Sequence, residues 1–131
     1  MAVATKDETV SIRITRAERR NLEADARRKG IPTATVAAHY IAEGVRRSRF
    51  PAVEFRDGSP GRVACLAGTR WPVWLIVELV KDYSGQVEAA AKQMNRPPAL
   101  IPMALDYAAA YPEEIEADLQ LAEHRRRDAR S

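Results

Sequence analysis

The chain has 131 residues, 46% of them apolar and 30% charged, with a formal net charge of +3. This composition is typical of a soluble globular protein. No apolar run approaches the roughly 20 residues of a membrane helix, and the opening stretch MAVATKDET lacks the apolar core of a secretion signal. We therefore expect a cytoplasmic protein with no membrane partner.

The reactive side chains are few and scattered. A lone cysteine, Cys65, excludes an internal disulfide and a thiolate metal cluster, and we expect it in the core. His39 and His124 have no acid or cysteine at ligand spacing, and there is no nucleophile–base pair or glycine-rich phosphate loop. We expect no metal, no cofactor and no enzymatic activity.

Charge is distributed unevenly along the chain. Residues 10–49 carry ten basic side chains against four acidic ones, a net of +6. Residues 50–131 carry ten basic against twelve acidic side chains, a net of −2. This asymmetry suggests that nucleic acid is bound at one end of the chain only.

The stretch TVSIRITRAE, residues 9–18, predicts a short strand that leads directly into a helix. The apolar residues Val10, Ile12 and Ile14 alternate with polar ones, the period of a strand with one buried face. A strand needs a neighbour for its backbone N–H and C=O groups. No candidate follows for about forty residues.

Two helices are predicted after this strand. Thr15 and Glu18 form a capping box that opens a helix over 16–29, and Gly30 suits its left-handed end. Beyond Pro32, Thr33 or Thr35 can cap a second helix that runs to about Arg47.

A basic strand–helix–helix segment resembles the ribbon-helix-helix family of Arc- and MetJ-type repressors, here over residues 9–47. The resemblance implies that two copies pair their strands antiparallel and cover the ribbon with four helices. The missing strand would then belong to a second chain, making a homodimer through the N-terminal strand. The alternative is an edge strand in a monomeric domain, with the arginines as a solvated face.

The resemblance also implies roles for individual residues. One ribbon face would enter the major groove of operator DNA and contact bases through Thr9, Ser11 and Arg13. Phosphates would bind the N–H groups of Thr33, Ala34 and Thr35, and the side chains of Arg46, Arg47 and Arg49. Family members often have Ser or Thr where Pro32 stands. Proline lacks an N–H donor, so the phosphate contact is expected one residue later.

The pattern changes at RRSRFP, residues 46–51, which divides the chain into domains 1–49 and 50–131. In the second domain, AVEFR and RVACLAG predict a hairpin around the turn DGSPG. Four helices follow: VWLIVELVKDY, SGQVEAAAKQM capped by Ser84, ALIPMALDYAAAY started or bent by Pro102, and PEEIEADLQLAEHRRRDAR opened by Pro112.

Two separated motifs, GTRWPVWLI at 68–76 and ALDYAAAYPEEI at 104–115, resemble a bacterial family designated domain of unknown function four-three-three. The resemblance covers residues 50–119. It implies a VapB-type antitoxin domain with winged-helix-like helices, and a toxin partner that is usually a small PIN-like ribonuclease.

The helix that would lie in the recognition position, ALIPMALDYAAAY, carries only Asp106 as an ion. A DNA-reading helix needs basic side chains, so we favour protein contact for this domain. Its candidate toxin or dimer contacts are Trp71, Trp74, Glu113, Glu114 and Glu116, with Asp118 beside them. The alternatives are that the tryptophans are core residues and that the acids only complement a helix N-terminus.

These observations predict a mainly α fold with short β-structure: a ribbon-helix-helix dimerisation domain and a small winged-helix-like domain with a hairpin. We expect the antitoxin of a type II toxin–antitoxin pair that represses its own operon. The alternatives are a stand-alone transcriptional regulator whose second half serves dimerisation or effector binding, and a protein-interaction module that does not bind DNA.

Overall fold

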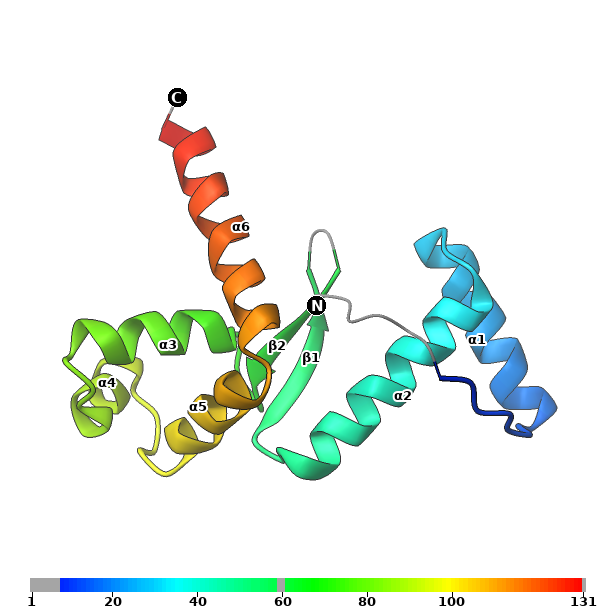
Figure 1. Ribbon diagram of the computed structural model, residues 1–131, viewed down its shortest axis with the longest axis horizontal. Helices are drawn as coiled ribbons and strands as arrows, with labels where there is room; N and C mark the ends of the chain where they lie inside the picture. The colour runs from blue at the N-terminus through cyan, green and yellow to red at the C-terminus, as the bar shows by residue number, and fades with distance from the viewer. Residues whose placement is uncertain (1–7, 59–60, 131) are drawn as a thin grey trace. The chain divides into compact units, whose positions relative to one another are not determined.

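The structure, a computed structural model, describes residues 8–58 and 61–130. Over these residues it is mainly helical, with one small antiparallel hairpin (Figure 1). The coarse fold class predicted from the sequence is therefore confirmed. The chain divides between Arg46 and Arg47 into two compact units, which we describe separately.

The N-terminal unit contains α1 (Arg16–Lys29) and most of α2 (Thr33–Arg49). As predicted, Thr15 caps α1, since its Oγ1 accepts a hydrogen bond from the Glu18 amide at 3.1 Å. Gly30 ends α1 with φ +67°, the left-handed conformation that glycine adopts at low cost. The second helix extends two residues beyond the predicted Arg47, so the RRSR segment is helical.

The predicted strand over residues 9–14 is not formed within the single chain. Residues 8–15 belong to no strand, and every one of them is exposed. The physical reason is that a strand exists only through hydrogen bonds to a neighbour. The described part of this chain places no neighbour beside the segment.

The C-terminal unit begins with the predicted hairpin, β1 (Val53–Asp57) and β2 (Arg62–Leu66). The register pairs Val53 with Leu66 and Phe55 with Ala64, so four apolar side chains share the buried face. The predicted turn, residues 57–61, lies partly outside the described residues.

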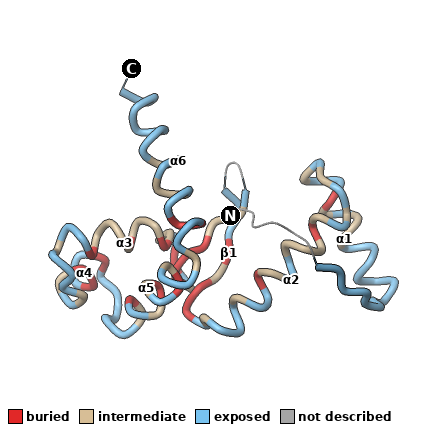
Figure 2. The backbone as a smooth tube through the Cα atoms, in the orientation of Figure 1, coloured by how far each residue is buried: buried red, intermediate tan, exposed pale blue. Residues whose placement is uncertain are grey.

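Helices α3 (Val73–Asp82), α4 (Val87–Met94), α5 (Leu100–Ala110) and α6 (Pro112–Arg130) complete this unit. Helix α3 contacts the other three helices and β2, and α5 contacts β1. The buried segments of this unit in Figure 2 therefore include parts of the hairpin, α3, α4, α5 and the start of α6. The largest fully buried side chains of this core are Leu66, Ile76, Ile101 and Tyr107.

Most helix boundaries agree with the sequence signals. Thr33 and Thr35, the predicted caps of the second helix, instead lie inside α2. Pro112 is the first residue of α6, as predicted, and Pro102 lies in the first turn of α5. The prediction that Ser84 caps α4 is wrong, because the cap position is Gln86. Ser84 (φ +56°) and Gly85 (φ +81°) instead form the turn after α3, where the Gly85 amide donates to the Val80 carbonyl at 2.8 Å.

Candidate nucleic-acid interface

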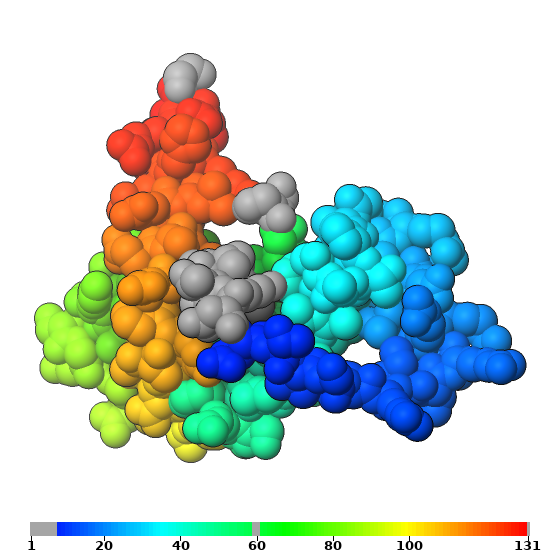
Figure 3. All heavy atoms as spheres, turned by 45° about the vertical axis from the view of Figure 1, so that its right-hand side comes forward, coloured from blue at the N-terminus to red at the C-terminus, as the bar shows by residue number. Residues whose placement is uncertain are grey.

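The N-terminal segment presents an uncovered apolar row. The exposed fractions of Val10, Ile12 and Ile14 are 81%, 62% and 47%. The three residues predicted to contact bases, Thr9, Ser11 and Arg13, are exposed as well. Figure 3 shows this segment, in the darkest blue, on the outside of the molecule. Both sides of the extended segment are therefore open to binding, one apolar and one polar.

The N-terminal unit has almost no core of its own. Among its described residues, Ala26 and Val36 are the only buried apolar side chains. Its second helix exposes Tyr40, Ile41 and Val45, whose exposed fractions are 38%, 54% and 52%. A unit of this size normally needs far more buried apolar surface to stay folded. Most of its large apolar side chains are therefore left partly or fully exposed within the single chain.

The start of α2 provides fewer amide donors than predicted. The N–H of Thr35 donates to the Pro32 carbonyl at 3.0 Å, and that of Val36 donates to the same oxygen at 3.2 Å. Thr35 therefore does not offer its amide to a phosphate in this conformation. The other two predicted donors, Thr33 and Ala34, lie in the first turn of α2, where an amide has no carbonyl one turn earlier to bind. These two amides remain the candidates for a phosphate contact.

The basic side chains form a solvent-facing array on both helices. Helix α1 exposes five arginines whose guanidinium groups are accessible to solvent: Arg16, Arg19, Arg20, Arg27 and Arg28. Arg28 also pairs with Asp25 at 3.1 Å. Near the end of α2, Arg47 and Arg49 are exposed and Arg46 is half-buried. Exposed arginines of this kind are candidates for phosphate contact, and each neutralised phosphate would add salt-dependent affinity.

The G-T-R motif forms a tightly hydrogen-bonded loop between β2 and α3. Gly68 (φ +74°) donates its amide to the Glu54 carboxylate at 3.1 Å. The hydroxyl of the buried Thr69 donates to the Leu66 carbonyl at 2.8 Å and accepts from the Trp71 amide at 3.0 Å. Thr69 therefore stabilises the loop and does not cap α3. Between these two anchors, Arg70 is exposed.

Two of the predicted partner contacts, Trp71 and Trp74, are half-buried against the hydrophobic core. The guanidinium of Arg126 lies over the Trp74 ring, 5.8 Å from its centroid, and pairs with Glu78 at 3.0 Å. Trp74 is thus partly covered within its own unit, which supports a packing role for this residue.

The acidic residues at the start of α6 do not behave alike. Glu113 and Glu116 are exposed, as a surface contact requires, and Asp118 is half-buried. Glu114 differs from the sequence-based expectation: it is 4% exposed and accepts a hydrogen bond from the hydroxyl of the fully buried Tyr107. A carboxylate held in this way is part of the core and does not reach a partner.

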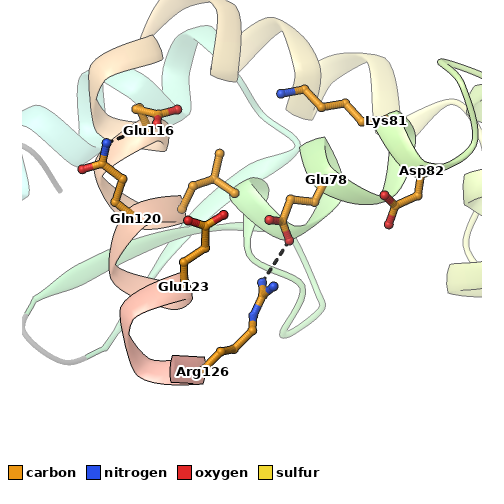
Figure 4. Close-up of a pocket in the computed structure, with 8 residues that line it drawn as sticks. Glu78, Lys81, Asp82, Glu116, Gln120, Glu123 and Arg126 are labelled. Carbon is orange, nitrogen blue, oxygen red and sulfur yellow. Dashed lines mark hydrogen bonds and ion pairs between the residues drawn. The ribbon is translucent and has the colours of Figure 1, made fainter. Parts of the chain in front are cut away.

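A groove of about 430 Å³ separates α3 from α6. Figure 4 shows Glu78, Lys81 and Asp82 projecting from α3, and Glu116, Gln120, Glu123 and Arg126 from α6. Four carboxylates therefore face two basic side chains. The groove was not predicted from the sequence, because it depends on how two helices some forty residues apart pack together. Glu116 therefore lies in a groove that has more acidic than basic side chains.

The described residues contain neither a cluster suited to a metal ion nor a helix that could span a membrane. No group of three or more His, Cys, Asp or Glu side chains is placed to hold a metal ion there. None of the helices combines the length and the apolar character needed to cross a membrane. Comparison of the chain with protein-family models, curated proteins and solved structures finds no match.

Proposed function

We propose that the chain is a dimeric, DNA-binding antitoxin of a type II toxin–antitoxin pair, with a ribbon-helix-helix N-terminal domain. The observation that carries the proposal is the uncovered apolar row of Val10, Ile12 and Ile14. Antiparallel pairing with the same segment of a second copy satisfies its backbone and buries these side chains. Exposed Ile41 and Val45 on α2 are available to cover the resulting ribbon.

The opposite side of the paired ribbon then presents Thr9, Ser11 and Arg13 twice, related by the twofold axis. A two-stranded ribbon fits the major groove, where arginine bonds bidentately to guanine. The arginines of α1 and α2 supply phosphate contacts that do not depend on sequence. The dimer therefore combines a narrow base-contacting surface with a broad electrostatic one.

The C-terminal unit is the proposed toxin-binding part. Glu113 is exposed, Glu116 lies in an acidic groove, and α5 offers no basic side chain for DNA. A basic ribonuclease of the PIN-like class has the complementary charge for such a surface. Glu114 is left out of this surface, because its carboxylate is buried.

DNA binding is tested by fluorescence anisotropy on the chain's own upstream sequence and on a scrambled duplex. We expect wild type to prefer the upstream duplex and Arg13→Ala to lose that preference, since one bidentate contact contributes about 1–3 kcal/mol of discrimination. Arg125→Ala removes the same charge from an exposed position of α6 and serves as the control. If Arg13→Ala and Arg125→Ala prefer the upstream duplex equally, Arg13 does not contact bases.

Toxin binding is tested by co-expressing the chain with the product of the neighbouring gene. We expect the neighbour alone to arrest growth and the chain to restore it. The double variant Glu116→Lys/Glu123→Lys reverses two charges of the groove and should fail to restore growth. The control Glu88→Lys, at an exposed position of α4, should still restore growth. A harmless neighbour would instead favour a stand-alone transcriptional regulator.

A further inference from the structure

A second positively charged site lies in the C-terminal unit and uses none of the residues assigned to DNA above. Arg70, Trp71, Leu75 and Arg96 line a shallow hollow of about 410 Å³, which we call the Arg70/Arg96 cleft. Trp71 and Leu75 supply apolar walls and the arginines supply the charge. No acidic residue lines it.

The backbone on both sides of the cleft is fixed. The loop that carries Arg70 is closed by the Leu66 amide, which donates to the Trp71 carbonyl at 2.9 Å. Arg96 follows the left-handed cap residue Asn95 (φ +55°), and its own amide donates to the Ala91 carbonyl at 3.0 Å. A charged group on a fixed backbone loses less conformational freedom when it binds a ligand.

The charges of the cleft are not neutralised within the chain. Other arginines of this unit form ion pairs: Arg56 with Glu54, Arg62 with Asp57 and Arg126 with Glu78, each at 3.0 Å. Within residues 8–58 and 61–130, the side chains of Arg70 and Arg96 have neither an ion pair nor a hydrogen bond. Two unpaired guanidinium groups beside one hollow form a site for an anion.

We infer that the Arg70/Arg96 cleft binds a backbone phosphate of double-stranded DNA. The guanidinium fork matches the geometry of a phosphate, and the apolar wall of Trp71 and Leu75 suits the adjacent deoxyribose. The hollow is shallow, as a contact with a continuous backbone requires. This inference rests on the proposed DNA-binding function and extends it, because it gives the toxin-binding unit a contact with DNA.

Such a contact adds affinity without sequence preference. Arg70→Gln/Arg96→Gln is therefore expected to weaken binding to upstream and scrambled duplexes equally, by about tenfold. It should also lower the slope of log affinity against log salt by about 1. The matched control Arg125→Gln/Arg130→Gln removes two charges from exposed positions of α6 and should leave the slope nearly unchanged.

Trp71 provides a direct measurement inside the cleft. The chain has two tryptophans, so Trp74→Phe isolates the emission of Trp71. We expect a saturable change in that emission with scrambled duplex, and its loss in the double variant. The same titration with poly-glutamate tests an acidic protein segment. A change with poly-glutamate but not with duplex would overturn the inference.

The two proposals fail differently. Equal wild-type affinity for upstream and scrambled duplexes contradicts the proposed repressor, while a lower salt slope in the double variant still supports the cleft. An upstream preference that depends on Arg13, with an unchanged slope in the double variant, supports the repressor and overturns the cleft. Absence of any duplex binding by wild type overturns both.

Discussion

The hydroxyl of Tyr40 donates a hydrogen bond to the carboxylate of Asp25 at 2.6 Å and so joins α2 to α1. Asp25 also accepts from Arg28 at 3.1 Å, and the ammonium of Lys29 lies 5.5 Å from the centre of the Tyr40 ring. Among the described residues of this unit only two apolar side chains are buried, and this polar cluster is a further link between the two helices.

The Tyr40 hydrogen bond, followed by Arg28, holds the pKa of Asp25 below its ordinary value. The stabilisation from Asp25 is therefore present above its unfolded pKa and is lost as the pH falls through the lower folded pKa. We predict that Tyr40→Phe raises the pKa of Asp25 toward the ordinary value, measured by NMR titration of the carboxyl carbon. The aromatic ring stays, so the contact with Lys29 serves as an internal control. An unchanged titration would mean that the Tyr40 hydrogen bond does not lower the pKa of Asp25.

A negative charge introduced at two neighbouring positions of the N-terminal segment is predicted to have two different effects. Ile12→Glu places a carboxylate in the proposed dimer interface and should raise the dimer dissociation constant by about a hundredfold or more. Ser11→Glu places it on the opposite side, where the dimer should persist and DNA binding should be lost. Light scattering coupled to size-exclusion chromatography measures the first effect, and anisotropy the second. Dimers that survive Ile12→Glu would rule out the ribbon.

The buried hydrogen bond between Tyr107 and Glu114 is predicted to stabilise the C-terminal unit. Tyr107→Phe removes the donor and leaves the carboxylate buried, which should reduce the free energy of unfolding by about 1–3 kcal/mol. The matched control is Tyr83→Phe, since the Tyr83 hydroxyl bonds Gln93 at the surface, and we expect a change below about 0.5 kcal/mol. Urea denaturation compares the two. Equal effects would show that the buried bond contributes no more than an exposed one.

Because of Asp118, the stability of the C-terminal unit is predicted to decrease as the pH rises. Burial, together with the charge of Glu114, raises the pKa of the Asp118 carboxyl. Its contribution is therefore greatest below the unfolded pKa and is lost as the pH rises through the folded pKa. Asp118→Asn should raise the urea midpoint at neutral pH more than near about pH 4. The exposed residue Asp106 provides the control, Asp106→Asn, for which no such difference is expected.

Local signals in the sequence predicted most of the elements. Thr15, Gly30 and Pro112 each act within a few residues of their own helix end, so their roles follow from the sequence alone. The Ser84 cap was wrong because Gly85 adopts a left-handed turn that belongs to the end of α3. A cap and a turn use the same residue types, and the choice between them depends on the helix before.

Interactions between distant residues could not be predicted. Glu113 and Glu114 are adjacent in PEEI, yet only Glu114 reaches the hydroxyl of Tyr107 inside the core. The acidic groove arises where α3 meets α6, and the Arg70/Arg96 cleft joins a loop to the end of α4. The predicted N-terminal strand also depends on a distant partner, and residues 8–58 and 61–130 place no second strand beside it.

The small core of the N-terminal unit has a consequence for how the protein responds to dilution. A unit that folds by covering its apolar row with a second copy is stabilised by mass action, so its melting temperature rises with protein concentration. The C-terminal unit surrounds its own core around Tyr107 and Ile76, so its core does not need the proposed pairing of the N-terminal segments. If the proposed dimer forms, a fall in the concentration of the chain therefore loosens the N-terminal unit first, while the C-terminal unit stays folded.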